Sequence, residues 1–263
     1  MSAGFSIEMS DGVSLAGETL GDASKPALVF SNSLGVTREM WREQADIFAK
    51  TYHVVLYDTR GHGLSDAPSG AYSLSRLSLD VLELMDGLKI QQAHFCGLSL
   101  GGMTGQALAV RAPERLLSLS LAATSAYMGP PSGWQARIKT VLENGMDSIS
   151  AAVLERWFMP EGHAGTDRKN NALSWLNCID PVGYAGCCAA IRDMDLQQTA
   201  AIIATPTFIL AGENDTATPP EHAQFLHDKI AGSTLVFMPG GHLLNLEQPT
   251  LFTDALSEFL NHH

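Results

Sequence analysis

The sequence is short of cysteine, which bears on redox state and on metal binding. Its 263 residues include four cysteines, at Cys96, Cys178, Cys187 and Cys188. Their spacing matches no metal site, and the adjacent pair could not easily form a structural disulfide with itself. We therefore expect reduced, mostly buried thiols, and we predict no metal site.

Long hydrophobic runs are missing as well. No apolar run approaches the roughly 20 residues that span a bilayer, and no positively charged start leads into an apolar stretch. We expect a soluble, cytoplasmic protein with no membrane partner. The apolar share of 45% is nevertheless enough for a substantial buried core.

Basic residues are few, since 16 lysines and arginines face 28 aspartates and glutamates, a net charge of -12. Such a chain would repel a phosphate backbone, so we expect no nucleic-acid partner. A small anionic substrate is not excluded, because exposed charges further away than about 8 Å are largely screened. A local arginine can then outweigh the total charge. Nothing in the sequence decides between a monomer and a homo-oligomer.

The sequence does contain a regular alternation of short apolar runs and helical patterns. Asp11-Gly12 joins two alternating runs, Phe5 to Glu8 and Val13 to Leu20, and predicts an antiparallel hairpin. Further strands are expected at residues 27–31, 53–57, 94–96, 116–122, 207–211 and 234–238, and helices at residues 39–50, 74–88, 223–230 and 250–260. This order predicts the α/β class, with a mostly parallel, doubly wound sheet.

A stretch of about 80 residues before Thr207 contains no β-rich run. Helices are expected there at residues 133–143, 148–158, 168–178 and 181–192, with Gly145 and Gly162 as stops and Asp180-Pro181 as a capped start. We predict a core domain of residues 1–124 and 199–263, and an all-helical lid domain of residues 125–198. Trp134, Trp157 and Trp175 in this lid either form an aromatic pocket wall or hold the lid helices together.

One serine is a candidate nucleophile. Ser99 stands in the stretch HFCGLSLGGM, with Gly97 and Gly101 two residues away on either side. Glycines at those positions suit a turn in which side chains would collide with the neighbouring backbone. The pattern alone is weak, but here an apolar strand precedes it and the expected helix from Leu100 to Val110 follows it.

A serine nucleophile needs a base, and the base needs an orienting carboxylate. Asp215 and His242 follow two consecutive later strands, and the chain order Ser, Asp, His is that of the α/β-hydrolase fold. We predict a Ser99–His242–Asp215 triad. Glu213 is a near competitor for the acid and Asp58 a less favoured one. The RGHG stretch after Asp58 indicates a structural turn, in which His62 is expected to be a hydrogen-bonded scaffold residue.

Acyl transfer also needs donors for the developing oxyanion. The backbone N–H of Leu100, at the start of a helix, is one expected donor. The second is expected from the loop NSLGVTREMW after the strand at residues 27–31, and we favour Leu34.

Several stretches together resemble bacterial 3-oxoadipate enol-lactonases of the α/β-hydrolase superfamily. They are SNSLG with Met40-Trp41, YDTRGHG, HFCGLSLGGM, DPVGYAGCCAAIRDMDL and PGGHLLNLEQP, and the resemblance as a whole runs from about Phe5 to the last helix, the lid included. Asn32-Ser33 stands where most hydrolases of this fold carry His-Gly, a departure that the lactonases share. The resemblance implies cofactor-free hydrolysis of a small anionic lactone, 3-oxoadipate enol-lactone, during the breakdown of aromatic compounds.

The substrate that this resemblance implies carries a free carboxylate, which needs a partner in an apolar pocket. Arg137 lies three residues after Trp134, so the two share a helical face and are candidate substrate-binding residues. Arg156 and Arg192 are rivals for the carboxylate, each expected rather to be a surface or lid-bracing residue.

The same residues are also compatible with other functions. A carbon–carbon bond hydrolase, a carboxylesterase or a perhydrolase would share the triad and differ in the lid. Haloalkane dehalogenation is disfavoured, because that chemistry uses an aspartate where this chain has Ser99. A receptor that retains a slow triad is a further alternative from a different class.

Overall fold

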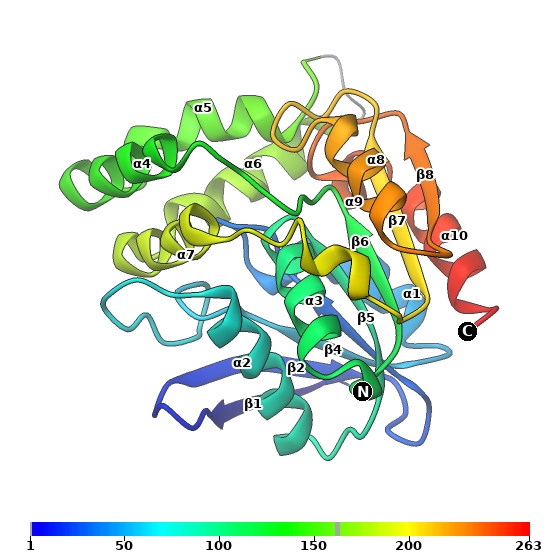
Figure 1. The fold of residues 1–263 in the computed structure, drawn as a ribbon. Coiled ribbons are helices and arrows are strands. Elements are labelled where there is room, and N and C mark those ends of the chain that lie inside the picture. The colour runs from blue at the N-terminus through cyan, green and yellow to red at the C-terminus, as the bar shows by residue number, and fades with distance from the viewer. Residues whose placement is uncertain (1, 161–163) are drawn as a thin grey trace.

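A central sheet of eight strands organises the molecule (Figure 1). The computed structural model describes residues 2–160 and 164–263. The spatial order is β1-β2-β4-β3-β5-β6-β7-β8, in which the strands are β1 (Ala3–Glu8), β2 (Ser14–Leu20), β3 (Ala27–Ser31), β4 (His53–Tyr57), β5 (Ala93–Leu98), β6 (Leu116–Ala122), β7 (Thr207–Gly212) and β8 (Thr234–Met238). Each predicted strand is present, and the mostly parallel α/β sheet is confirmed.

The antiparallel part of the sheet is confined to its first edge. β1 pairs with β2, and β2 with β4, in antiparallel register, whereas every later pair is parallel. The turn between β1 and β2 uses Gly12 at φ +80°, where a side chain would be strained. The hairpin predicted at Asp11-Gly12 is therefore confirmed.

Helices cover both faces of the sheet. In Figure 1 one face carries α2 (Leu74–Gly87), α3 (Leu100–Arg111) and α8 (Pro220–Lys229), and the other carries α1 (Arg42–Phe48) and α10 (Pro249–Leu260). Two buried apolar clusters correspond to these faces: Val81, Leu108 and Leu226 belong to one cluster, and Phe48 and Phe252 to the other. A parallel sheet covered on both faces is the arrangement that α/β crossovers produce.

Four helices form an insertion between β6 and β7 and gather beyond one end of the sheet (Figure 1). They are α4 (Pro131–Asn144), α5 (Asp147–Trp157), α6 (Gly165–Asn177) and α7 (Pro181–Asp193). Gly145 ends α4 at φ +75°, and the Asp180 carboxylate caps α7 by accepting from the Val182 N–H at 2.7 Å. Gly162, the other expected stop, lies outside the described residues.

The four inserted helices differ in how firmly they are held. In α7 nine residues are buried, whereas in α4 only Val141 is. A Cβ on Gly183 of α7 would lie 2.3 Å from the Cα of Gly61 in the core, which is closer than real Cβ atoms come. α7 therefore packs backbone to backbone against the core, and α4 packs on α7.

The expected elements differ from the observed ones at a few places. The helix expected at residues 39–50 begins as a 3₁₀ turn, Arg38–Trp41, before α1. A short 3₁₀ helix, Thr199–Ile202, and the four-residue helix α9 (Leu244–Glu247) were not expected. Four-residue elements are too short for hydrophobic periodicity to indicate them.

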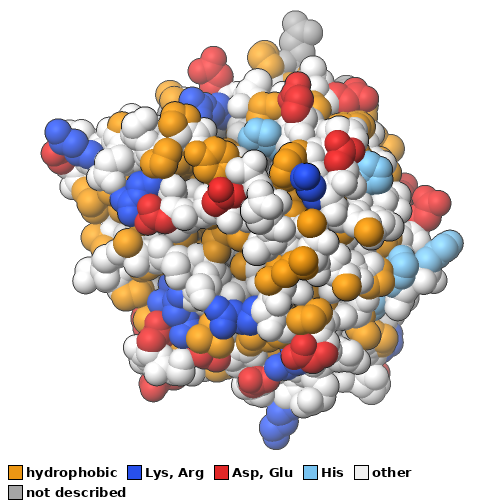
Figure 2. Space-filling model, in the orientation of Figure 1, with side chains coloured by type: hydrophobic (Ala, Val, Ile, Leu, Met, Phe, Trp, Pro, Cys, Tyr) orange, Lys and Arg blue, Asp and Glu red, His pale blue; other side chains and the backbone are white. Residues whose placement is uncertain are grey.

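The surface carries charged side chains of both signs, whereas most of the cysteines are buried. On the face that Figure 2 shows, acidic and basic side chains are interspersed rather than segregated. Cys96, Cys187 and Cys188 are buried free thiols, as predicted, whereas the free thiol of Cys178 is exposed. Within residues 2–160 and 164–263, no helix combines the length and the apolar character needed to cross a bilayer.

Candidate active site

The sheet reverses its direction of growth at β3, whose neighbours are β4 on one side and β5 on the other. The loops that follow two adjacent parallel strands at such a switch point border a crevice at the carboxyl ends of the strands. Ser31 at the end of β3 pairs with Gly97 near the end of β5, so the loops after these residues emerge side by side. The loop that contains Leu34 therefore lies next to the Ser99 turn.

The turn at Ser99 is tight and strained. Ser99 has φ 56° and ψ -112°, a conformation that a residue with a side chain rarely adopts. A Cβ on Gly97 would lie 2.2 Å from the carbonyl oxygen of Gly101, and a Cβ on Gly101 would lie 2.2 Å from that of Ser31. Both flanking positions therefore require glycine, as the sequence pattern predicts.

His242 and Asp215 come together after β8 and β7. The His242 Nδ1–H donates to Asp215 Oδ2 at 2.8 Å, and Asp215 Oδ1 accepts from the backbone N–H groups of Ala217 and Thr218 at 2.7 and 2.9 Å. The Thr218 hydroxyl donates to Asp215 Oδ2 at 2.7 Å. With Nδ1 committed in this way, Nε2 of the neutral ring is left to act as a base.

The pKa of Asp215 lies below its ordinary value. Burial works in the opposite direction and would raise it, but the charge of His242 and the hydrogen bonds from His242 and Thr218 outweigh burial. Asp215 is thus held ionised, in a side chain whose residue is 3% exposed. An ionised, buried carboxylate in this position can stabilise a histidine imidazolium.

The rival acids lie elsewhere. Glu213 is exposed. Asp58 is buried, forms an ion pair with Arg38 and accepts from the Leu64 N–H at 3.1 Å, so its carboxylate braces a loop. Neither makes a hydrogen bond with His242 among the described residues.

His62 is the scaffold residue that the RGHG turn indicates. Its Nε2 accepts from the Gly35 N–H at 2.9 Å, and its Nδ1–H donates to the Arg60 carbonyl oxygen at 3.3 Å. Burial lowers the pKa of His62 to about 4, so the ring is neutral near pH 7 and keeps Nε2 available as an acceptor. The His62 ring thereby fixes the position of Gly35, the residue that follows Leu34.

Leu34 and Leu100 carry the candidate oxyanion donors. Gly101 N–H donates to the Asn32 carbonyl oxygen at 2.9 Å, which ties the loop after β3 to the start of α3. Within residues 2–160 and 164–263, neither the Leu34 N–H nor the Leu100 N–H has a backbone acceptor. Both donors are therefore available next to Ser99, one from the loop and one from a helix N-terminus.

A cavity of about 530 Å³, counting space open to solvent, joins these groups. Its floor comes from the core and consists of Ser33, Leu34, Ser99, Met103, Ala217, Thr218 and His242. Its roof comes from the inserted segment and consists of Met128, Trp134, Arg137, Val153, Arg156, Trp157, Tyr184 and Ile191. Ser99 and His242 face this common cavity without a direct hydrogen bond, a contact that often forms only when substrate binds.

The candidate substrate-binding residues both lie in the roof. The Arg137 guanidinium stacks 4.8 Å from the centre of the Trp134 ring, whose Nε1–H donates to the Met128 carbonyl oxygen at 2.7 Å. Trp157 also lines the cavity, whereas Trp175 does not and packs against the apolar cluster of the core. The aromatic wall is therefore confirmed for two tryptophans, and Trp175 holds helices together.

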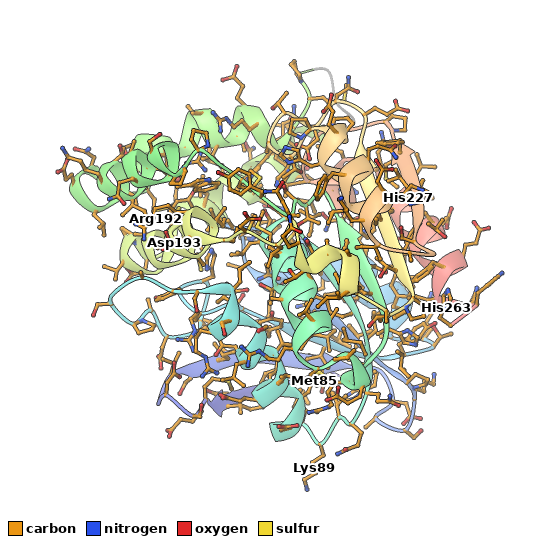
Figure 3. All side chains as sticks on the ribbon, viewed as in Figure 1. Met85, Lys89, Arg192, Asp193, His227 and His263 are labelled. Atoms are coloured by element: carbon orange, nitrogen blue, oxygen red, sulfur yellow. The ribbon has the colours of Figure 1, made fainter. Side chains whose placement is uncertain are left out.

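The two rivals of Arg137 separate clearly. Arg192 forms an ion pair with Asp193, beside it at the end of α7, and donates to Gln135 of α4 at 2.6 Å (Figure 3). Arg192 is thus a lid-bracing residue, as expected. Arg156 is exposed, as expected for a surface residue, and it also lines the cavity together with Arg137.

Several contributing groups were missed at the sequence level. The Trp157 carbonyl oxygen accepts from the N–H groups of His242 and Leu243 at 3.0 and 3.1 Å. The buried Glu247 carboxylate accepts from the Met159 N–H at 2.9 Å and from the Gly241 N–H. These bonds tie the end of α5 to the His242 loop. No sequence pattern indicates them, although the Thr218 bond was foreseeable, since an aspartate often accepts from the backbone two or three residues on.

Among the residues that the structure describes, no group of three or more histidine, cysteine, aspartate or glutamate side chains could hold a metal ion. The groups that converge on the cavity are a hydroxyl, an imidazole, backbone N–H donors and two guanidiniums.

Known proteins of similar sequence and structure include several hydrolases. A family model described as the alpha/beta hydrolase fold matches residues 26–249. The chain is 41% identical over 245 residues to 3-oxoadipate enol-lactonase 2 of Acinetobacter baylyi, covering 93% of this chain and 92% of the relative. The enol-lactonase of Burkholderia xenovorans LB400 superposes with a TM-score of 0.94 at 36% identity, covering 98% of this chain and 100% of that one. A hydrolase from Pseudomonas aeruginosa superposes with a TM-score of 0.94 at 43% identity, covering 98% of both chains.

Proposed function

The chain belongs to the α/β-hydrolase family, and from that premise we propose that it hydrolyses 3-oxoadipate enol-lactone to 3-oxoadipate in the breakdown of aromatic compounds. The observation that carries the proposal is that Ser99 and His242 line one cavity. Asp215 accepts a hydrogen bond from His242. The identity to enol-lactonases over almost the whole chain supports the choice of substrate.

Ser99 is the proposed nucleophile. His242 Nε2 takes the Ser99 proton while Oγ attacks the lactone carbonyl carbon, and Asp215 stabilises the resulting imidazolium. The ester bond to the enol oxygen then breaks, and His242 returns the proton to that oxygen. The result is an acyl-Ser99 ester that still carries the enol at its other end.

Water completes the reaction in the second half. His242 accepts a proton from water, which attacks the acyl carbon, and Ser99 leaves with the proton from His242. The balance is one lactone and one water converted into one dicarboxylic product. The enol becomes a ketone by moving one proton from oxygen to carbon, which removes the group that could close the ring again.

The remaining roles follow from position. We propose the N–H groups of Leu34 and Leu100 as the oxyanion hole; removing one such donor typically costs on the order of a hundredfold to a thousandfold in turnover. We propose that Trp134 and Arg137 bind the substrate, with Arg137 paired to its free carboxylate. We propose residues 125–198 as the lid domain that carries this selectivity, over a core of residues 1–124 and 199–263.

We also propose that the enzyme works in the cytoplasm without a cofactor. Its four cysteines are free thiols, which suits a reducing compartment. The reaction as written needs only water and the groups named above.

The experiment follows the loss of the enol-lactone by ultraviolet absorbance, with a simple aryl ester as a second substrate. The native protein should consume the lactone rapidly and the ester much more slowly, and Ser99→Ala should abolish both activities while folding normally. Ser99-dependent cleavage of the ester with an untouched lactone would keep the serine hydrolase and reject the lactonase. Lactone loss that survives in Ser99→Ala would reject the nucleophile.

A further inference from the structure

Arginine pairing in this protein is uneven. Of ten arginines, seven form ion pairs with carboxylates, and Arg111 donates to the hydroxyls of Ser75 and Ser78. Arg137 and Arg156 have no carboxylate partner within residues 2–160 and 164–263. Two such arginines that line the same cavities are candidates to bind an anionic group from outside the described residues.

Arg137 and Arg156 both line two neighbouring cavities at the candidate active site. Both belong to the roof of the reaction cavity. Both also line a second cavity of about 590 Å³, counting space open to solvent, against Gly129, Pro130 and Gly133, and the two cavities share Met128 and Trp134 as well. The second cavity is thus a side chamber next to the reaction cavity, with a guanidinium from α4 and another from α5 at the boundary.

The side chamber has the composition of an anion site. Two guanidiniums in the lining of one cavity repel each other, and an anion bound between them offsets that repulsion. Arg137 is half-buried and its guanidinium carbon lies 4.8 Å from the centre of the Trp134 ring, a contact that restricts the movement of its donors. Planar forks of this kind match a carboxylate better than a spherical ion.

We propose that Arg137 and Arg156 together form a carboxylate-binding site in this side chamber, which selects esters and lactones that carry a second, free carboxylate. This deepens the proposed function and rests on it for the natural substrate. Arg156, an exposed residue at the edge of the roof, is the new member of the site, and it binds the substrate together with Arg137.

The geometry of the proposed substrate suits such a site. In the enol-lactone the free carboxylate is joined through one methylene to the ring carbon that bears the leaving oxygen. When the roof binds this carboxylate, the leaving oxygen of the ring therefore lies toward the roof and away from the floor. The lactone carbonyl is then directed toward Ser99 and the two proposed oxyanion donors.

The test compares two aryl esters of similar size. The anionic probe is the mono-4-nitrophenyl ester of glutaric acid, and the neutral probe is 4-nitrophenyl pentanoate. For Arg137→Gln and for Arg156→Gln we expect kcat/KM to fall about tenfold on the anionic probe and to stay within about twofold on the neutral one. The double variant should no longer distinguish the two probes.

Arg192→Gln is the matched control, because Arg192 lies on the same inserted segment but is paired with Asp193. It should leave the ratio between the two probes unchanged. The proposal is overturned if Arg156→Gln lowers both probes equally, or if Arg192→Gln changes the ratio as much as Arg156→Gln does.

The enol-lactone itself separates this proposal from the proposed function. If the anionic probe depends on both arginines but the lactone is not consumed, the carboxylate site stands and the lactonase is rejected. If the lactone is consumed at an unchanged rate by Arg156→Gln, the lactonase stands and the two-arginine site is rejected.

Discussion

The floor and the roof of the cavity are built in opposite ways. The floor consists of loops at strand ends, where Ser99, Asp215 and His242 are 7%, 3% and 3% exposed and glycines bring backbone against backbone. The part of the roof formed by α4 is mostly exposed, and a Cβ on its Gly133 would meet nothing within 4 Å. Closely packed backbone thus holds Ser99, Asp215 and His242, and side chains on a thinly packed helix face the cavity.

The roof is nevertheless not free of the floor. The Gly61 and Gly183 contact holds α7 to the core, and the Trp157 carbonyl oxygen accepts two N–H groups of the His242 loop. Within the inserted segment, α7 and the end of α5 are therefore anchored, and α4 is the helix with the fewest buried side chains. Changes in the floor should alter catalysis, and changes in α4 should alter selection.

Glycine-to-alanine substitutions in the floor and in the roof should give the largest difference in activity. In Gly101→Ala the new Cβ collides with the Ser31 backbone, and overpacking of this kind typically costs about 1–3 kcal/mol. We expect kcat to fall at least a hundredfold as the Ser99 turn shifts. Circular dichroism and thermal unfolding would show whether the variant also loses its fold.

Gly133→Ala is the control in the roof. With open space around it, the new methyl group should leave kcat on a neutral ester, which does not use the side chamber, unchanged and stabilise the protein by about 0.4–1 kcal/mol. A Gly101→Ala protein with normal activity, or a Gly133→Ala protein without it, would contradict the contrast between floor and roof.

Removal of the Thr218 hydroxyl should weaken catalysis by about 10- to 100-fold, the usual size of a hydrogen bond to a charged group. Thr218→Val keeps the shape but loses the bond to Asp215, while Thr218→Ser keeps the bond. That bond helps to lower the pKa of Asp215, so Thr218→Val should also move the acidic limb of the kcat/KM profile to higher pH.

The pH profiles of the two Thr218 variants provide the check. If Thr218→Ser loses as much activity as Thr218→Val, packing matters there and the hydroxyl does not. An unshifted acidic limb in Thr218→Val would show that the hydroxyl does not help to keep Asp215 ionised.

His62 makes stability depend on pH in a definite direction. Its pKa is about 4 in the folded chain and ordinarily about 6.5, so between these values the unfolded chain binds a proton that the folded chain does not. The free energy of unfolding should therefore fall as the pH drops from about 6.5 to 4. His62→Gln should lose less stability than the native protein when denaturant titrations at pH 7 and pH 5 are compared.

His94 has the same lowered pKa, about 4, and remains in the His62→Gln variant, so part of the acid sensitivity should persist. Equal losses of stability on acidification in the native protein and in His62→Gln would show that His62 is not held neutral by its burial.

The smallest expected effect concerns Trp134. Trp134→Phe keeps an aromatic face under Arg137 but loses the bond to the Met128 carbonyl oxygen. A stacked guanidinium at a partly exposed site is worth about 0.5–1 kcal/mol, so Trp134→Ala should raise KM for an anionic ester about two- to fivefold. Trp134→Phe should fall between Trp134→Ala and the native protein. A change of kcat without a change of KM would place Trp134 in the chemistry instead.

Much of the fold could be predicted because its signals are local. The strands at residues 27–31, 53–57, 116–122 and 234–238 were located to the residue, since each is a short apolar run between turn residues. The Ser99 turn was recognisable from its two glycines because the collision that requires them involves backbone close in sequence or on the adjacent strand. Element ends that depend on capping or on 3₁₀ turns were off by a few residues.

The sequence alone determined the order of strands and helices, the Ser99 turn and the Ser, Asp, His order, because these depend on neighbours within a few residues. Only the tertiary structure decided between Asp215, Glu213 and Asp58, because burial and a bond to a histidine 27 residues away separate them. It alone set Arg156 beside Arg137 and bound Glu247 to Met159 across 88 residues. The helix face that meets a cavity is determined by packing against distant elements, and no local pattern contains that information.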